Sequence, residues 1–187
     1  MIEESDFAAL LDRARAGDDD AVAVLFHDLH PRLVRFLRAR EPVAADDLAA
    51  EVWMAVATGL GRFVGDAAAF RAWVFSIARR RMADHRRRGL RRNTRPVGNE
   101  SFDRTPAVDD PEHEVVGQLS ALEAAQLVVA TLPGDQAEVI LLRVLADLDV
   151  AEVAEVLGRT ANWVRVTQHR ALRRLANRLG PKLDVMR

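Results

Sequence analysis

Apolar residues recur at intervals of three and four along both halves of the chain, a spacing that predicts amphipathic helices rather than strands. In the N-terminal half we expect four helices, the last over about residues 67–88. Pro31 lies inside the second, where a kink or a break is expected. The apolar stripes are Phe7, Leu10, Leu11 and Ala14; Val22, Leu25, Phe26, Leu29, Leu33, Phe36 and Leu37; Leu48, Val52, Ala55 and Val56; and Phe70, Trp73, Val74, Ile77, Ala78 and Met82.

The C-terminal half has the same helical spacing, with two further helices and then a closely spaced pair. A short helix over about residues 150–157, a break at Gly158 and a longer basic helix over about residues 161–179 have the outline of a helix-turn-helix. The apolar stripes here are Leu119, Leu122, Ala125, Val129 and Leu132; Ala137, Ile140, Leu141, Val144 and Leu145; Val150, Val153, Ala154 and Leu157; and Val164, Ala171, Leu172, Leu175 and Leu179.

Between the halves, the stretch from Asn93 to Gly117 is rich in proline and glycine and has no sustained apolar period, which is typical of a linker. We therefore predict an all-α protein with two small helical domains, residues 1–92 and 118–187, joined by a flexible linker over residues 93–117.

Composition excludes several classes of function. The 187 residues include no cysteine, so disulfides, thiolate zinc sites and cysteine nucleophiles are ruled out. His27 and His30 are the only closely spaced pair with metal-ligand character, and a metal reading is weak because only Asp28 offers a third donor. Without a glycine-rich phosphate loop, a nucleophile elbow or paired carboxylates in an apolar context, the sequence argues against an enzyme and predicts no cofactor.

No apolar run in the sequence approaches the length of about 20 residues that spans a bilayer. The N-terminus is acidic, which is the wrong charge for a secretory signal. We therefore expect a cytoplasmic protein without membrane insertion.

Charge is strongly segregated, although the formal net charge is only -1. Residues 1–58 carry 12 acids against 6 arginines, and residues 71–95 carry ten arginines against one acid. Residues 96–126 are acidic again, and residues 159–187 hold eight bases against one acid. A single basic block is often just a solvated helix face. Two blocks, each ending a helical unit, favour contact with phosphate backbones.

The second helix of the predicted helix-turn-helix has a polar, basic face. We expect Thr160 to cap its N-terminus, Gly158 to supply a left-handed turn, and the first turns to reach base edges while later arginines hold phosphates. An ordinary helical hairpin with a solvated basic face stays open as the alternative. Trp163 could pack beneath the preceding helix or stand at the DNA surface. The candidate DNA-binding residues are Thr160, Asn162, Trp163, Arg165, His169, Arg170 and Arg173.

A second candidate nucleic-acid surface mixes aromatic and cationic residues, as single-stranded DNA requires. Phe70 and Trp73 lie on an apolar stripe, so a core position is favoured over a base-stacking one, and the arginines are the better candidates for contact. The candidate residues are Arg62, Phe63, Asp66, Phe70, Arg71, Arg79, Arg80, Arg86, Arg87 and Arg88.

The helix that precedes this surface is acidic, with Asp46, Asp47 and Glu51 interleaved with Leu48, Val52 and Trp53. An acidic surface beside a basic one favours a protein partner in addition to DNA. A solvated helix face is the equally good alternative.

The two halves resemble an RNA polymerase sigma factor of the extracytoplasmic-function (ECF) group of the sigma-70 family. The resemblance lies in DDLAAEVWMAV at 46–56, FRAWVFSIARRRMADHRRR at 70–88, LPGDQAEVILLRVLADLDVAEVAEVLG at 132–158 and VRVTQHRALRRL at 164–175. It implies a sigma region 2 domain followed by a sigma region 4 domain.

The resemblance implies roles that spacing does not give. The acidic helix, with Asp46, Asp47, Glu51 and Trp53, would bind core RNA polymerase at the clamp helices of the largest subunit, and the second domain would meet the flap of the second subunit. Residues 63–70 would capture a flipped base of the minus-ten promoter element, with the arginines of the following helix helping to open it. Residues 160–173 would read the minus-thirty-five element.

The implied function is promoter-specific transcription initiation by a factor that binds core polymerase and promoter DNA. Whether an anti-sigma protein sequesters the chain stays open. The alternatives are a helix-turn-helix regulator that binds DNA without polymerase, and a structural or protein-interaction module whose arginines are only solvated surface.

Overall fold

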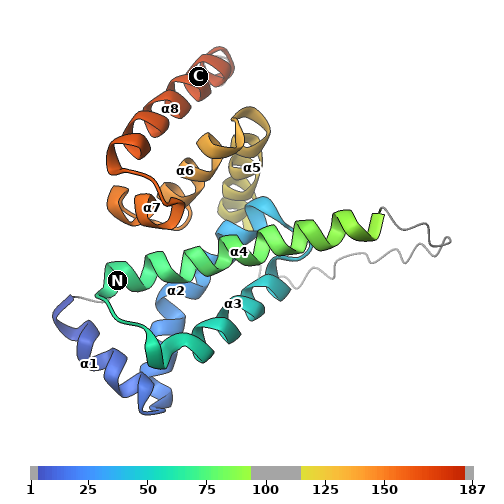
Figure 1. Cartoon of the computed structure of the whole chain (residues 1–187). Coiled ribbons are helices and arrows are strands. Elements are labelled where there is room, and N and C mark those ends of the chain that lie inside the picture. The colour runs from blue at the N-terminus through green and yellow to red at the C-terminus, as the bar shows by residue number, and fades with distance from the viewer. Residues whose placement is uncertain (1–3, 94–114, 184–187) are drawn as a thin grey trace.

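The computed structural model describes residues 4–93 and 115–183, and in these residues every regular element is helical. Figure 1 shows the N-terminal helices below the C-terminal ones, with α7 above the long helix α4. The predicted all-α fold class is confirmed. The helices are α1 (Glu4–Arg15), α2 (Asp19–Arg40), α3 (Ala45–Gly59), α4 (Ala67–Asn93), α5 (Val115–Thr131), α6 (Gly134–Val144), α7 (Val150–Leu157) and α8 (Ala161–Leu183), with a 3-10 turn, η1 (Leu60–Arg62), after α3.

The second helix decides against a break, one of the two alternatives expected at Pro31. Helix α2 is continuous from Asp19 to Arg40 with Pro31 inside it, so the chain does not break there. Proline removes one backbone hydrogen bond from a helix. The loss is tolerated because Leu29 and Leu33, on either side of Pro31, are both fully buried against the neighbouring helices. Tertiary packing thus overrides the local preference.

Two other bounds differ from the sequence prediction. Helix α4 continues to Asn93, five residues past the expected end. Helix α5 begins at Val115, so Gly117, predicted to end the linker, is helical. The rest of the predicted linker, residues 94–114, lies outside the described residues.

Three apolar residues that the spacing assigned to the C-terminal core are exposed: Val129, Val144 and Leu172. In α8 the buried positions are Val164, Thr167 and Ala171, while Leu172 is 50% exposed. The buried face is therefore rotated toward Thr167, a residue whose hydroxyl masked the pattern. Periodicity finds the helix correctly but misplaces its contact face.

The helix-turn-helix formed by α7 and α8 is confirmed in its local geometry. A capping box begins α7: the Asp149 side chain accepts from the Glu152 amide, and the Glu152 side chain accepts from the Asp149 amide. Gly158 ends α7 with φ +61°, the left-handed conformation that glycine adopts without steric cost. Thr160 Oγ1 accepts a hydrogen bond from the Trp163 amide at 3.2 Å, which makes it the cap of α8.

The N-terminal and C-terminal helices pack against one another. Helix α7 lies against α4, and α2 contacts both α5 and α6. One connected cluster of buried side chains runs from Phe7 in α1 to Val164 in α8. Within the described ranges, no helix is both long enough and apolar enough to cross a bilayer.

Candidate nucleic-acid and protein interfaces

The outward face of α8 is polar, basic and open. Val164, Thr167 and Ala171 hold one side of the helix in the core, so the opposite side faces outward. Thr160, although exposed, uses its hydroxyl to cap the helix. Among the described residues no ion pair joins Arg165, Arg170 or Arg173 to a carboxylate, so their guanidinium groups are available to phosphates. The exposed candidate residues are Asn162, Arg165, His169, Arg170 and Arg173.

Trp163 is half-buried and packs against the core cluster. The guanidinium carbon of Arg159 lies 5.4 Å from the centroid of its ring, a cation–π arrangement. The tryptophan thus has one side against the core and a cation over its face. Of the two positions that the sequence left open, packing is the one observed.

The segment before α4 is built around a cluster of aromatic rings. Phe63 stacks on Trp73 with ring centroids 5.1 Å apart and meets the edge of Phe70 at 5.4 Å. Phe63 and Phe70 are both buried, so the core interpretation of Phe70 is confirmed and neither ring is open to a base in this structure. Their promoter roles stay predictions, while Arg62 and Val64 in the same segment are exposed.

Two residues in this segment have structural roles that the sequence reasoning missed. Gly65 has φ +155°, and a Cβ there would lie 2.7 Å from the Ala69 Cβ, so only glycine fits. Asp66, a candidate DNA contact, caps α4 by accepting a hydrogen bond from the Ala69 amide at 2.7 Å. An aspartate directly before the first helical apolar residues was the available signal for that cap.

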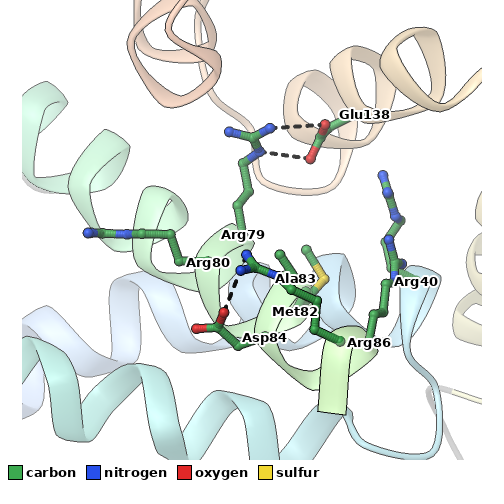
Figure 2. Close-up of a pocket in the computed structure, with 9 residues that line it drawn as sticks. Arg40, Arg79, Arg80, Met82, Ala83, Asp84, Arg86 and Glu138 are labelled. Atoms are coloured by element: carbon green, nitrogen blue, oxygen red, sulfur yellow. Dashed lines mark hydrogen bonds and ion pairs between the residues drawn. The ribbon is translucent and has the colours of Figure 1, made fainter. Parts of the chain in front are cut away.

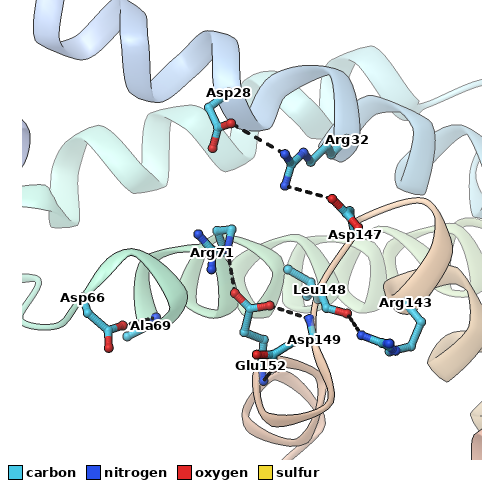
Figure 3. Close-up of polar contacts among 10 residues, drawn as sticks. All are labelled: Asp28, Arg32, Asp66, Ala69, Arg71, Arg143, Asp147, Leu148, Asp149 and Glu152. Carbon is cyan, nitrogen blue, oxygen red and sulfur yellow. Dashed lines mark hydrogen bonds and ion pairs between the residues drawn. The ribbon is translucent and has the colours of Figure 1, made fainter. Parts of the chain in front are cut away.

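The arginines in the first half of α4 are bound by carboxylates of the C-terminal helices. Arg71 Nε lies 2.6 Å from Glu152 Oε1 (Figure 3). Arg79 binds both oxygens of Glu138, with Nε–Oε1 at 2.8 Å and Nη2–Oε2 at 3.3 Å (Figure 2). Its Nη1 also donates to the Val156 carbonyl at 2.8 Å. Both arginines were candidate DNA contacts, and both are occupied here.

The second half of α4 is more open. Arg80 is exposed, and its Nε donates a long hydrogen bond to the Ser76 carbonyl, at 3.3 Å. The exposed guanidinium groups of Arg86, Arg87 and Arg88 pair with Glu41, Asp84 and Glu51 respectively. Exposed ion pairs of this kind contribute little and are easily exchanged for other anions.

A cavity of about 450 Å³ lies among α2, α4 and α6. Its lining includes five arginines and Glu138, and Figure 2 shows Arg40 and Arg79 extending on either side of the α6 carboxylate. Burial lowers the pKa of Arg40 from its usual value, and its Nε and Nη1 atoms have no hydrogen-bond partner among the described residues. The sequence reasoning did not single out Arg40, because its position next to Glu138 depends on contact between the two halves.

Helix α3 carries the acidic candidate surface. Asp46 and Asp47 are exposed in its first turn, and Glu51 is half-buried one turn later. Asp46 Oδ1 lies 3.3 Å from Arg38 Nη2. Val43, 96% exposed, and Met54, 70% exposed, flank the carboxylates. Exposed apolar residues beside acids are typical of a protein interface, a feature that sequence reasoning missed.

Trp53, a fourth candidate on α3, faces inward instead. Its Nε1 donates to His30 Nδ1 at 3.2 Å, and its ring lies 4.9 Å from that of Phe26. Phe26 also stacks on the His30 ring at 4.4 Å. Burial is the main reason that the pKa of His30 is lowered from its usual value, which favours the neutral imidazole that accepts this hydrogen bond.

The histidine pair His27 and His30 does not form part of a metal-ligand group in the described part of the chain. No three histidine or carboxylate residues converge there in a way that could hold a metal ion.

Comparison with known families agrees with this arrangement. The family model for Sigma-70 region 2 matches residues 25–92, and the model for Sigma-70 region 4 matches residues 122–175. The first contains the acidic helix and the basic helix α4, and the second contains the helix-turn-helix.

Similar proteins cover almost the whole chain. The ECF RNA polymerase sigma factor SigD of Mycobacterium tuberculosis is 31% identical over 177 residues, which cover 91% of this chain and 82% of SigD. The ECF RNA polymerase sigma factor ShbA of Streptomyces griseus is 36% identical over 182 residues, covering 92% of this chain and 95% of ShbA. A solved structure of CnrH in complex with the cytosolic domain of CnrY has a similar fold, with a TM-score of 0.65 at 23% identity, over 92% of this chain and 96% of CnrH.

Two region-specific matches in the expected order, together with relatives of this identity and coverage, confirm the resemblance found in the sequence. Proteins of this family work with core RNA polymerase and promoter DNA, and their part in transcription is generally non-catalytic. The chain belongs to the ECF group of the sigma-70 family and acts as a sigma factor in transcription initiation.

Proposed function

We propose that three surfaces have separate roles in initiation. One binds core polymerase, one binds the minus-ten element and one reads the minus-thirty-five element. The observation that carries this proposal is the segregation of charge on the folded surface. Exposed carboxylates lie on α3, whereas exposed arginines lie on the second half of α4 and on the outward face of α8. Like-charged DNA would be repelled by the first surface and attracted by the other two.

The acidic surface of α3 binds core polymerase in this proposal. Asp46, Asp47 and Glu51 supply charge for the clamp helices of the largest subunit, and Met54 supplies apolar area that would be covered on binding. Trp53 contributes from within, because its hydrogen bond to His30 fixes α3 against α2. The flap of the second subunit would meet region 4.

The minus-ten surface consists of the segment 62–66 and the arginines of α4. The buried ring of Phe63 anchors the segment on Trp73, leaving Arg62 and Val64 at the surface to meet an unstacked base. Arg80, Arg86 and Arg87 supply charge for the backbone, and Arg71 and Arg79 would join them once released from region 4. Unpairing a base costs on the order of a few kcal/mol, which such contacts offset.

The minus-thirty-five element is read by α8. Its first turns carry Asn162 and Arg165, which suit adenine and guanine edges in the major groove, and Arg170 and Arg173 lie where a helix meets phosphates. The same face carries His169. Domain boundaries follow from these roles, with polymerase and minus-ten contacts in residues 1–92 and minus-thirty-five contacts in residues 118–187.

The test is polymerase association by a charge-reversed α3. The double variant D47R/E51R should lose binding to purified core polymerase and run-off transcription, while its circular dichroism stays unchanged. The matched control is E155R, which reverses an exposed acid on α7. Polymerase binding at the wild-type level in D47R/E51R would refute the assignment of α3.

A gel-shift with promoter DNA separates this proposal from a polymerase-independent regulator. The sigma factor should shift the DNA strongly only when core polymerase is present, because two weak sites gain avidity when polymerase fixes their spacing. If the arginines were merely solvated, as in a structural or protein-interaction module, the affinity for DNA would depend little on salt concentration. A cytoplasmic location and a lack of catalytic activity follow from the proposed role, and an anti-sigma partner remains an open prediction.

A further inference from the structure

Arg15, the last residue of α1, is hydrogen-bonded to the backbone of the connecting segment, residues 60–66, which joins α3 to α4 (Figure 1). Its Nε donates to the Leu60 carbonyl at 3.3 Å, and its Nη2 donates to the Phe63 carbonyl. The guanidinium group is planar and rigid, so two of its N–H groups on two different carbonyls fix both the position and the orientation of the segment.

Arg15 is itself held in place by α1. Its Nη1 lies 3.0 Å from Oδ1 of Asp12, one turn earlier in the same helix. Phe7 and Leu11 are buried, and the centroid of the Phe7 ring lies 5.6 Å from that of Phe70 in α4. The guanidinium group therefore reaches the two carbonyls from a helix that is fixed against the core.

The connecting segment is also held by close packing against α4. The Phe63 ring stacks on Trp73 with centroids 5.1 Å apart. A Cβ at Gly59, just before the segment, would lie 2.7 Å from Cζ2 of Trp73, and a Cβ at Gly65 would lie 2.7 Å from the Ala69 Cβ. The backbone thus lies close to α4 at both ends of the segment, which restricts its conformation between the two glycines.

The side chains that these contacts leave free face the solvent. Val64 is 90% exposed, and Arg62 is exposed as well. A surface whose conformation is already fixed loses less conformational entropy when it binds a partner. An exposed valine and an exposed arginine on such a backbone can therefore contact an unstacked base with little reordering.

We propose that Arg15 is a positioning residue of the minus-ten surface, which holds the connecting segment so that Arg62 and Val64 meet an unpaired base in a fixed geometry. Arg15 lies outside residues 25–92, the part of the chain that the Sigma-70 region 2 model matches. The simpler alternative is that Arg15 only caps backbone carbonyls and stabilises the fold. This inference rests on the proposed minus-ten role of the segment.

The first test measures the hold on the segment in the free full-length protein. Hydrogen-exchange mass spectrometry should show faster amide exchange over residues 60–66 in R15A than in the wild type, because local opening there no longer breaks the two hydrogen bonds. The matched control is R13A, which removes the same charge from α1 but breaks an ion pair with Asp18 instead. Unchanged exchange in R15A, or equally faster exchange in R13A, would overturn the proposal.

The second test measures base capture by the holoenzyme assembled from core polymerase and each variant. The probes are fork-junction DNAs with a single-stranded minus-ten element, taken from a promoter found by run-off transcription. In a matched set of probes, one base at a time is replaced by an abasic site. At the captured position the wild type should lose about tenfold in affinity without the base. R15A should lose much less, because it binds the intact probe more weakly and the abasic probe equally well, whereas R13A should match the wild type.

The positioning role is overturned if R15A keeps the wild-type difference between the probes, or if it weakens binding of both probes equally, as a purely structural role predicts. R15K keeps the charge without the two-pronged donor geometry, so full recovery in R15K would also overturn it. Circular dichroism checks the fold of R15A, and R15Q, which keeps a neutral amide donor, serves as the milder variant.

Failure of the proposed minus-ten role gives a different result. If the wild type shows no difference at any position, or if the double variant R62A/V64A keeps the wild-type difference, the connecting segment does not capture the base. The inference about Arg15 then fails together with that role. Loss of the difference in R62A/V64A but not in R15A would instead leave the role of the segment intact and refute only the positioning by Arg15.

Discussion

Helices α4 and α8 are both long and arginine-rich, and each carries a candidate DNA surface, yet their arginines are in different situations. In α8 the candidate arginines are exposed and form no ion pair within the described residues. In α4, Arg71 and Arg79 are bound to carboxylates of the other half of the chain. The comparison teaches that arginine content predicts attraction to DNA, but the fold decides which guanidinium groups are free.

The helices also differ in what they bury. Helix α4 is held by aromatic rings, with the centroid of Phe70 5.6 Å from that of Phe7 and 5.9 Å from that of Trp73. Helix α8 is held by the smaller Val164, Thr167 and Ala171. Large rings remove more apolar area from water than small side chains do. Anchoring at the core should therefore be stronger for α4.

The largest expected effect is on the stability of region 2. F70A should lower the free energy of unfolding by about 3–5 kcal/mol, because it removes a buried ring from a close-packed cluster. Urea unfolding followed by circular dichroism measures this. The control is L172A in α8, half-exposed, which should change stability by no more than about 0.5 kcal/mol. Weaker DNA binding by F70A at full stability would instead make Phe70 a base platform.

The next effect concerns the free arginines of α8. R165A should weaken binding of the minus-thirty-five duplex by the polymerase holoenzyme by about 1–3 kcal/mol if the side chain meets a base edge. Fluorescence anisotropy on a promoter found by run-off transcription measures the loss. R178A, an exposed arginine further along α8, is the control and should have a smaller effect. Equal losses in the two variants would mean that α8 attracts DNA without reading it.

The N-terminal caps allow a direct comparison of the two helices. D66A at the start of α4 and T160A at the start of α8 should each cost about 1 kcal/mol, since each removes a hydrogen bond to a first-turn amide. D66N and T160S keep an acceptor and should restore most of the stability in thermal unfolding. If D66A left stability unchanged but reduced transcription, the main role of Asp66 would be DNA contact.

The smallest effect is a pH dependence confined to region 2. Burial lowers the pKa of His30 in the folded state, so the unfolded state binds a proton more readily there. Stability should therefore fall as the pH drops below about 6.5, the ordinary value of histidine, toward the lowered folded value. H30Q removes this titration and should flatten that part of the pH profile in urea unfolding. An identical profile in H30Q would refute the role of His30.

Much of the fold follows from local sequence signals, and the comparison of α4 with α8 shows which features such signals cannot predict. The helices, the turn at Gly158 and the cap at Thr160 depend on neighbouring residues, so periodicity and residue type suffice. The sequence prediction misplaced the contact face of α8, because Thr167 is polar yet buried and Leu172 is apolar yet half-exposed. Packing against α6 and α7 fixes that face, and no single helix contains the information.

The candidate surfaces were predictable as clusters of charge. Which of their arginines are paired with carboxylates of the other half of the chain was not predictable. Arg71 and Glu152 are 81 residues apart in the sequence, and Arg79 and Glu138 are 59 apart. A pair at such separation leaves no periodic trace in a single sequence. The inward position of Trp53 likewise depends on His30 in another helix.

Glu152 connects the start of one short helix with the association of two domains. One of its oxygens accepts a hydrogen bond from the Asp149 amide in its own turn, and the other accepts from Arg71, far away in the chain. Glutamine there would keep an oxygen for the amide of Asp149 while giving up the charge that Arg71 requires. Genetic screens that score only lost activity would therefore confuse a folding defect with a docking defect at this position, and the amide isostere is the substitution that tells them apart.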